Sequence, residues 1–206
     1  MKDLIVLAAD AQQEAVLRML LEHRRESLGI RPITLDTERH AGKDPGVYSQ
    51  GAQFLSVFAS QYHRAIVVLD EEWEGGPNDA EAIALRLGKD LDQNEWQGRH
   101  CTVVIAPELD VWVWADSPHV EGVLGLDMVT IRNMGLDAGF WPEHAAKPTR
   151  PKELLERVLR RTGKPRSSAL YAKLARRVSL ASCTDPAFRL LRDTLRAWFP
   201  VQPDQL

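Results

Sequence analysis

Short apolar runs recur along the first half of the chain and predict buried strands. Residues 4–9 (LIVLAA) and 65–70 (AIVVLD) are continuous apolar runs of strand length. Residues 101–114 form a third run, which we expect to turn at Pro107, and residues 33–35 are a shorter candidate. The sequence therefore predicts three strong strands and one weak one.

The segments between these strands have apolar residues at helical spacing. They predict helices over residues 11–26, 52–63 and 79–91. Residues 40–46 (HAGKDPG) contain Gly, Pro and Asp and predict a loop. This alternation of strand and helix predicts an α/β fold, a sandwich built around a mainly parallel central sheet.

The sequence changes character after residue 140. Residues 141–153 are rich in proline and charge, as linkers are, and three helical patterns follow over residues 151–163, 167–180 and 185–199. Proline near the start of a pattern, and serine or aspartate just before it, favour helices in this part of the chain.

Composition limits the class of protein. The chain has 206 residues, of which 44% are hydrophobic and 27% charged, as in a globular protein. No apolar run is long enough to span a membrane, and the acidic start does not resemble a secretory signal. Cys101 and Cys183 are too few for a disulfide framework. We therefore expect a cytoplasmic protein with reduced thiols.

Charge is divided unequally along the chain. Residues 147–206 hold 14 Lys and Arg against 5 Asp and Glu, a balance of +9, whereas residues 1–146 have a balance of −12. We therefore expect residues 1–145 to form the α/β domain and residues 146–206 a basic helical extension. Such an extension predicts an anionic partner, or docking of the extension on the acidic body.

The basic extension supplies candidate nucleic-acid contacts. Clustered Lys and Arg on helices can bind backbone phosphates without reading the sequence of bases. The alternatives are a solubilising helix face or a contact with the acidic body. The candidates are Arg157, Arg160, Arg161, Lys164, Arg166, Lys173, Arg176 and Arg177.

Acidic residues end the three strongest predicted strands. Asp10 and Asp70 follow the first two, and Glu108 with Asp110 lies in the third. In parallel sheets, functional groups gather beyond the carboxyl ends of the strands. Carboxylates there are suitable ligands for Mg²⁺ or Mn²⁺, which can support phosphoryl transfer. The alternative is that Asp10 and Asp70 only cap the helices that follow.

Three segments resemble TOPRIM-like domains. Asp10 and Glu14 have the spacing of the first-strand acids of these domains, in the segment AADAQQE. Asp70 and Glu72, in VVLDEEWEG, resemble their acid–x–acid signature after a later strand.

The third segment, PELDVWVWAD at residues 107–116, resembles a motif of TOPRIM-like proteins of the DUF4276 kind, with Asp110, Trp112 and Asp116 at matching positions. Proteins of this kind occur in prokaryotic defence loci. The whole chain resembles a small component of methylation-associated anti-phage systems.

The resemblance implies Mg²⁺-dependent (or Mn²⁺-dependent) phosphodiester chemistry on nucleic acid, with other defence proteins as partners. The residues that it assigns are two catalytic acids, Asp10 and Glu14, and four metal ligands, Asp70, Glu72, Glu108 and Asp110. The chain lacks the glycine that usually follows the first acid, and it has aspartate at position 10 and glutamate at position 72 where the family pattern has the reverse. A non-catalytic assembly subunit or a nucleic-acid-binding subunit is therefore the alternative.

Two further groups of side chains have open roles. His40 could move a proton and Lys43 could hold a phosphate, or both could be exposed in a turn together with Asp44. Trp112 and Trp114 alternate along the third predicted strand.

Trp73 and Trp96 lie elsewhere in the chain. The aromatic side chains of all four tryptophans could stack on bases or could pack in the core.

Overall fold

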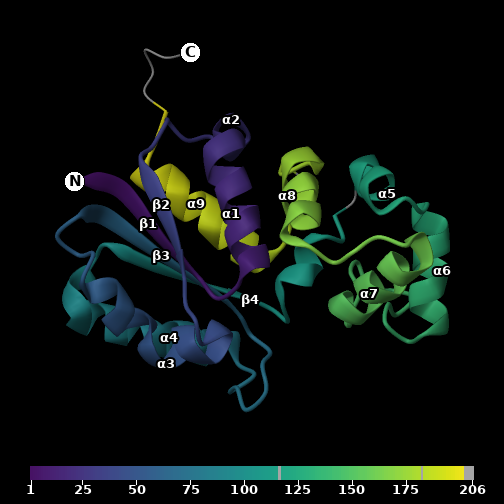
Figure 1. Cartoon of the computed structure of the whole chain (residues 1–206), viewed down its shortest axis with the longest axis horizontal. Helices are drawn as coiled ribbons and strands as arrows, with labels where there is room; N and C mark the ends of the chain where they lie inside the picture. Colours follow the sequence, from purple (N-terminus) through teal and green to yellow (C-terminus); the bar gives the residue numbers. More distant parts are fainter. Residues whose placement is uncertain (116, 182, 202–206) are drawn as a thin grey trace.

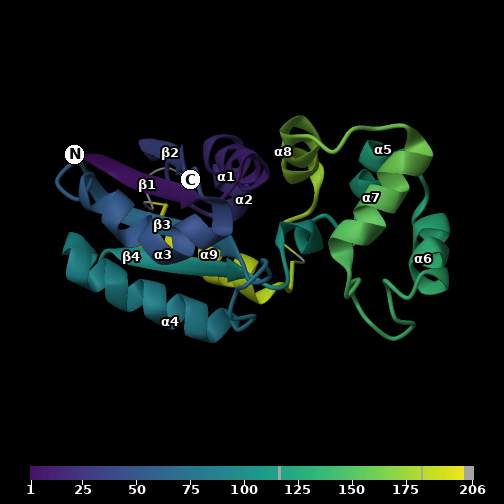
Figure 2. The ribbon, with the colours of Figure 1, turned by 60° about the horizontal axis from the view of Figure 1, so that its bottom comes forward.

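The computed structural model describes residues 1–115, 117–181 and 183–201. Four parallel strands form the central sheet in the order β2–β1–β3–β4, with helices on both faces (Figures 1 and 2). The strands are β1 (Lys2–Ala8), β2 (Leu35–Arg39), β3 (Tyr62–Asp70) and β4 (His100–Ile105). The predicted α/β fold with a mainly parallel central sheet is confirmed.

β1 lies inside the sheet and is covered on both faces. It pairs in parallel with β2 on one side and with β3 on the other, so that Val6 lies beside Thr37 and Ile66. Every residue from Leu4 to Ala8 is 0% exposed. Continuous apolar sequence in this strand therefore reflects burial of both faces, as is usual in parallel sheets.

Each face of the sheet has its own helices. Helices α3 (Lys43–Ser56) and α4 (Ala80–Leu91) cover one face, and α1 (Ala11–His23) and α9 (Pro186–Trp198) cover the other (Figure 1). Helix α8 (Ser168–Arg177) packs on α1 rather than on the sheet.

The remaining helical segments do not cover the faces of the sheet. Segments α2, η1 and η2 are only four or five residues long, and three helices form a separate lobe. Helices α5 to α7 form a lobe next to α8 (Figure 2). Their bounds, with those of the short segments, are α2 (Arg25–Leu28), η1 (Asp92–Trp96), η2 (Leu109–Trp112), α5 (Pro118–Leu124), α6 (Met128–Asp137) and α7 (Pro151–Thr162). The sequence patterns did not predict α5 and α6.

The helices predicted after residue 150 are present and have the expected ends. Helix α7 begins at Pro151 and is followed by Gly163, whose φ of 66° suits glycine. Ser167 caps α8 by accepting a hydrogen bond from the backbone of Leu170, and Asp185 caps α9 in the same way.

The last of these helices belongs to the main core. Leu191 and Leu195 of α9 lie in the same buried cluster as Leu4 and Val6 of β1. One hydrophobic core cluster therefore crosses residue 145, where the sequence predicts the boundary between the α/β domain and the basic helical extension.

The strand predicted over residues 101–114 is wrong in its second half. β4 ends at Ile105, the Ala106–Pro107 peptide bond is cis, and the chain then forms the 3-10 turn η2. Val111 and Val113 alternate in sequence because both are buried in the core between the sheet and the lobe, not because they share a strand face.

The loop predicted over residues 40–46 and the helix predicted over residues 52–63 are also wrong in their limits. Helix α3 begins at Lys43 and ends at Ser56. Gly46, which suggested a turn, lies inside the helix where the ring of His40 packs on it. A Cβ atom at position 46 would lie 2.2 Å from Nδ1 of His40, so this glycine serves close packing.

In the described part of the chain, none of the helices combines the length and the apolar character needed to cross a membrane.

Candidate functional site

The candidate site lies at the carboxyl ends of β1 and β3, the two central strands of the sheet. The chain leaves β1 toward one side of the sheet and leaves β3 toward the other, which is the arrangement that places ligand sites in α/β proteins. A cavity of about 750 Å³ opens there, which we call the strand-end cavity. Its charged lining consists of Asp10, Asp44, Asp70, Glu72, Glu108, Arg39, Lys43, Lys152 and Arg166.

Asp10 both caps α1 and borders the cavity. Its Oδ1 accepts hydrogen bonds from the backbone N–H groups of Gln12 and Gln13, each at 2.8 Å. The capping alternative is therefore correct for Asp10, but it occupies only one of the two carboxylate oxygens.

Asp70, the last residue of β3, is held by a buried glutamine. Nε2 of Gln13 donates to Oδ1 of Asp70 at 2.9 Å, and the backbone N–H of Leu109 donates to the same oxygen at 2.9 Å. Gln13 is 1% exposed, and its own Oε1 accepts from the backbone N–H of Ala9 at 2.9 Å. The Ala9 contact fixes the orientation of the amide, so that its NH₂ group points at the carboxylate.

Asp44 is a third carboxylate of the cluster. It lies in the first turn of α3, and its Oδ1 accepts from the backbone N–H of Asp70 at 2.9 Å and from Nε2 of Gln13 at 3.5 Å. The Gly and Pro beside Asp44 predict an exposed turn at this position. An acidic residue shortly before a predicted helix is the sequence feature that could have identified Asp44 as a site residue.

The environment of these carboxylates opposes their ionisation. Burial raises the pKa of Asp70 well above its usual value, and the nearby charges of Asp44, Asp10 and Glu108 raise it further. Burial also raises the pKa of Asp44, to which the charge of Asp10 contributes. Such a cluster is stabilised by a proton or by a cation.

The donor set fits Mg²⁺ in its usual, mostly hydrated form. The hydrogen bonds that Asp10 and Asp70 accept within the described residues end on Oδ1, which leaves Oδ2 of each available. The described ranges contain no group of three or more His, Cys, Asp or Glu arranged to hold a metal. Mg²⁺ commonly takes one or two carboxylates and completes its shell with water and substrate phosphate, so the residues present suit it.

Glu108 follows β4 and faces the same cavity. Its Oε2 lies 3.7 Å from Nζ of Lys152. Burial and the charge of Asp110 raise the pKa of Glu108 to about 7, against the opposing effect of Lys152. A carboxyl group that titrates near neutral pH is suited to proton transfer.

The raised pKa of Glu108 predicts how stability depends on pH. Between its ordinary pKa of 4.5 and about 7, folded Glu108 holds a proton that the unfolded chain has lost. The free energy of unfolding should therefore fall as pH rises through this window, by about 1–2 kcal/mol once solvent screening is allowed for. Urea unfolding at pH 5 and pH 8 in EDTA measures this change. The fall should be smaller in Glu108→Gln, and equal falls in both proteins would contradict the assignment.

The structure separates one predicted acid, Glu14, from this cluster. Glu14 turns toward β2, where its Oε2 lies 2.7 Å from Nε of Arg39 and Thr37 donates to its Oε1 at 3.1 Å. Glu14 does not line the strand-end cavity, whereas Glu72 lines it and is exposed.

Asp110 does not line the strand-end cavity and instead bonds to other side chains in the interior. It is 1% exposed, and its two oxygens accept from Nη2 of Arg166 at 2.8 Å and from the hydroxyl of Tyr171 at 2.6 Å. Both oxygens are used within the protein, so the predicted role of Asp110 as a metal ligand is not supported. Asp116 lies outside the described residues.

The predicted basic set is partly used in internal contacts. Arg166 pairs with Asp110, and Nζ of Lys164 donates to the carbonyl of Val123 at the end of α5. The other six, which are exposed on α7 and α8, are Arg157, Arg160, Arg161, Lys173, Arg176 and Arg177. Of the eight, Arg166 alone is among the residues that line the strand-end cavity.

A second polar cavity adjoins the first. It has a volume of about 520 Å³ and lies at the start of α7, so we call it the α7 cavity. It shares Glu72, Trp73, Glu108 and Lys152 with the strand-end cavity. The two form neighbouring parts of one polar surface.

Backbone strain occurs at the rims of both cavities. Lys43 borders the strand-end cavity and has φ of 51°, and Asn78 borders the α7 cavity and has φ of 50°. These are two of the three described non-glycine residues with positive φ, a conformation that is costly and often found at functional sites.

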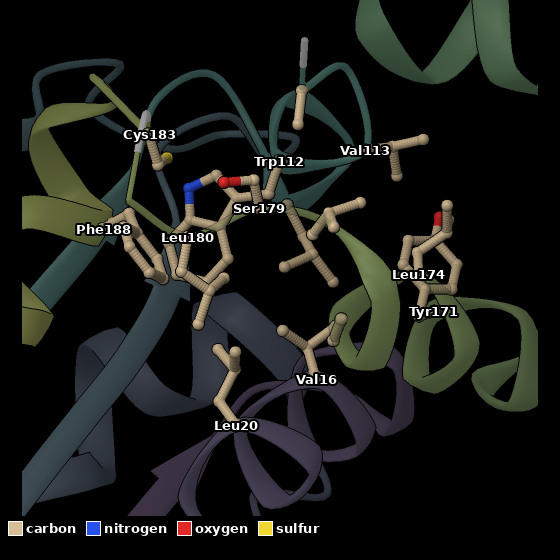
Figure 3. Close-up of a pocket in the computed structure, with 14 residues that line it drawn as sticks. Val16, Leu20, Trp112, Val113, Tyr171, Leu174, Ser179, Leu180, Cys183 and Phe188 are labelled. Atoms are coloured by element: carbon tan, nitrogen blue, oxygen red, sulfur yellow. The ribbon is translucent and has the colours of Figure 1, made fainter. Parts of the chain in front are cut away.

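The apolar cavity between α1, α8 and α9 has a different character (Figure 3). Its volume is about 40 Å³, and the side chains that surround it include Val16, Leu20, Tyr171, Leu174 and Phe188. It has room for about one water molecule and is a packing gap.

Two of the tryptophans considered as base-stacking groups are parts of the core. Nε1 of Trp112 donates to Oδ1 of Asp185 at 2.9 Å, and Nε1 of Trp114 donates to the carbonyl of Pro151 at 3.1 Å. Trp114 is 3% exposed. These contacts support the packing alternative for both.

Comparison with protein-family models, with curated proteins and with solved structures finds no match for this chain.

Proposed function

We propose that this chain is a Mg²⁺-dependent, nuclease-like protein that acts on phosphodiester bonds of nucleic acid. The observation that supports this proposal is the meeting of Asp10, Asp44, Asp70 and Glu108 at one strand-end cavity. Oxygen ligands for a hard cation, a carboxyl group with a pKa near 7 and several cationic side chains are groups that can support phosphodiester hydrolysis.

The cavity residues have separable roles in this proposal. Asp10 and Asp70 offer one oxygen each to the cation, and Gln13 holds Asp70 in place. When bound, Mg²⁺ would neutralise charge on the phosphate and lower the pKa of a bound water. Lys43 and Lys152 line the cavity where they can contact phosphate oxygens.

Glu108 is the proposed proton-transfer group, in place of the Asp10 and Glu14 that the sequence predicts for this role. As a carboxylate it accepts a proton from water while the water oxygen bonds to phosphorus and the bond from phosphorus to the leaving oxygen breaks. The leaving oxygen then takes a proton from solvent. The position of Glu108 at the cavity and its pKa of about 7 support this role.

Glu108→Gln should lower the rate of cleavage of labelled DNA or RNA by about 10²–10⁴-fold, because the amide cannot accept the proton. The measurement is single-turnover cleavage in Mg²⁺ or Mn²⁺, with calorimetry to follow metal binding. Glu156→Gln, a change on the outer surface of α7, serves as the control and should leave the rate unchanged. Equal rates for Glu108→Gln and wild type would contradict the proposed role of Glu108.

We also propose that the protein works in bacterial antiviral defence, in the cytoplasm and with other defence proteins. The support for this setting is the resemblance of the three sequence segments to TOPRIM-like proteins of defence loci.

A specific surface favours a second candidate function, that of an assembly subunit. On α6, Val129 is 72% exposed, and an apolar hollow of about 560 Å³ beside it is bordered by Trp114, Met128 and Trp141. Exposed apolar patches often bind other proteins. If the protein neither binds metal nor cleaves nucleic acid, the role of assembly subunit becomes the better proposal.

A further inference from the structure

Trp73 lies where the two polar cavities meet. It comes from the loop between β3 and α4 and lines both the strand-end cavity and the α7 cavity. The proposed phosphodiester chemistry gives no role to this side chain. Trp73 packs at the edge of the buried cluster that α3 and α4 form on one face of the sheet, yet its ring also borders two polar cavities. Core packing alone does not explain a large aromatic ring on a polar surface.

The position of the Trp73 ring is fixed from one side. It packs against the ring of Tyr48 on α3, with 5.4 Å between ring centroids and an interplanar angle of 51°. The guanidinium of Arg86 lies 4.2 Å from the centre of the Tyr48 ring, so α4 also supports the arrangement.

Gly76 makes room for the same ring. A Cβ atom at position 76 would lie 2.7 Å from Cε2 of Trp73, which is closer than real side chains approach. The loop therefore needs glycine here for the ring to keep its place. Trp73 is half-buried, and the part of it not used in these contacts borders the cavities.

Cationic side chains border both of the cavities that Trp73 lines. Lys152 borders both cavities, Arg150 borders the α7 cavity, and Arg39 and Lys43 border the strand-end cavity. Proteins that bind single-stranded nucleic acid commonly place cationic side chains along the phosphate backbone and aromatic rings against the bases.

We propose that Trp73 stacks on an unpaired base of a single-stranded nucleic acid whose phosphates lie in the strand-end and α7 cavities. This inference rests on the proposed function, and it adds that the substrate is single-stranded at the site. The strand enters over Lys152 and Arg150 and places one base on the indole ring. The next phosphate then lies near the cation that Asp10 and Asp70 would hold.

The test compares two fluorescein-labelled oligonucleotides of equal charge, an eight-residue oligothymidylate and its abasic counterpart, by fluorescence anisotropy in low salt with Ca²⁺. Wild type should bind the oligothymidylate about 5- to 100-fold more tightly, the range expected for one stacked base. Trp73→Ala should lose most of this preference and Trp73→Phe should keep part of it. Gly76→Ala keeps the indole but displaces it, so it should also weaken the preference.

Trp198→Phe serves as the matched control, because Trp198 lies at the end of α9 and lines neither cavity. Thermal unfolding of each variant checks that the fold is kept. Equal affinity of wild type for the two oligonucleotides would overturn the stacking proposal, as would an unchanged preference in both Trp73→Ala and Gly76→Ala.

A further measurement separates failure of this inference from failure of the proposed function. If neither oligonucleotide binds but Mg²⁺ still binds in a manner that depends on Asp70, the stacking proposal is wrong and the metal site stands. If Mg²⁺ binding is absent as well, both proposals are wrong.

Discussion

Replacing Asp70 with asparagine should abolish Mg²⁺ binding while leaving the fold as stable as that of wild type at neutral pH. Asparagine has nearly the same shape, and its Oδ1 can still accept the hydrogen bonds from Gln13 and Leu109. It cannot offer a charged oxygen to the cation. We expect metal affinity to fall by at least about 100-fold, since even changes outside the ligand shell cost 10- to 100-fold.

The expected stability of this variant follows from the raised pKa of Asp70. Burial and the charges of Asp44, Asp10 and Glu108 oppose ionisation of Asp70 in the absence of metal. A neutral amide removes that penalty, so the free energy of unfolding in EDTA should stay equal or rise.

Calorimetric titration with Mg²⁺ and urea unfolding in EDTA, each on wild type and Asp70→Asn, measure the two effects. Asp137→Asn, an exposed change on α6, is the control. Unchanged metal binding, or a loss of stability greater than about 2 kcal/mol, would show that the carboxylate of Asp70 has a structural role instead.

Replacing Asp110 with alanine should have the opposite pattern, with a large loss of stability and little direct effect on the metal. Asp110 is 1% exposed and is bonded to both Arg166 and Tyr171. Its removal leaves a partly buried guanidinium without its partner. Breaking a fully buried ion pair typically costs about 3–5 kcal/mol. Arg166 is partly open to solvent, so we expect a smaller loss of about 2–3 kcal/mol.

A double-mutant cycle with Arg166→Met tests whether the cost arises from the pair. The double variant Asp110→Ala/Arg166→Met should be less destabilised than the sum of the two single variants, because no unpaired charge is left. Urea unfolding of the four proteins gives the coupling energy. A loss below about 1 kcal/mol in Asp110→Ala would show that the ion pair contributes little.

Local sequence signals predicted the central sheet and much of the candidate site. β1 and β3 are continuous apolar runs because both of their faces are buried. The two strands are adjacent and parallel, so the acids that follow them lie at the same edge of the sheet. Asp10, Asp70 and Glu108 accordingly share one cavity. Ser167 and Asp185 predicted the starts of α8 and α9. Each cap bonds to a backbone N–H group only three residues later, so it is visible in the local sequence.

The remaining features depend on contacts between residues far apart in the chain. Asp110 is bonded to residues 56 and 61 positions later, and no local pattern reports that contact. Pro45 and Gly46 predict a turn around Asp44, because both residues are common in turns. In the structure Gly46 instead lies inside α3 and makes room for the ring of His40. The resemblance to TOPRIM-like domains stays a prediction from sequence segments.

The packing of α9 on the sheet also bears on how the protein is made. Helix α9 packs on β4, so this face of the sheet stays uncovered until the ribosome has synthesised residues 186–198. By then β1 has long since emerged from the ribosome. Domains generally fold as units during synthesis, so this chain must hold an incomplete sheet with exposed apolar residues for most of its translation. Messages truncated before codon 186 should therefore yield insoluble chains, and the nascent protein should be a good substrate for chaperones that bind apolar segments.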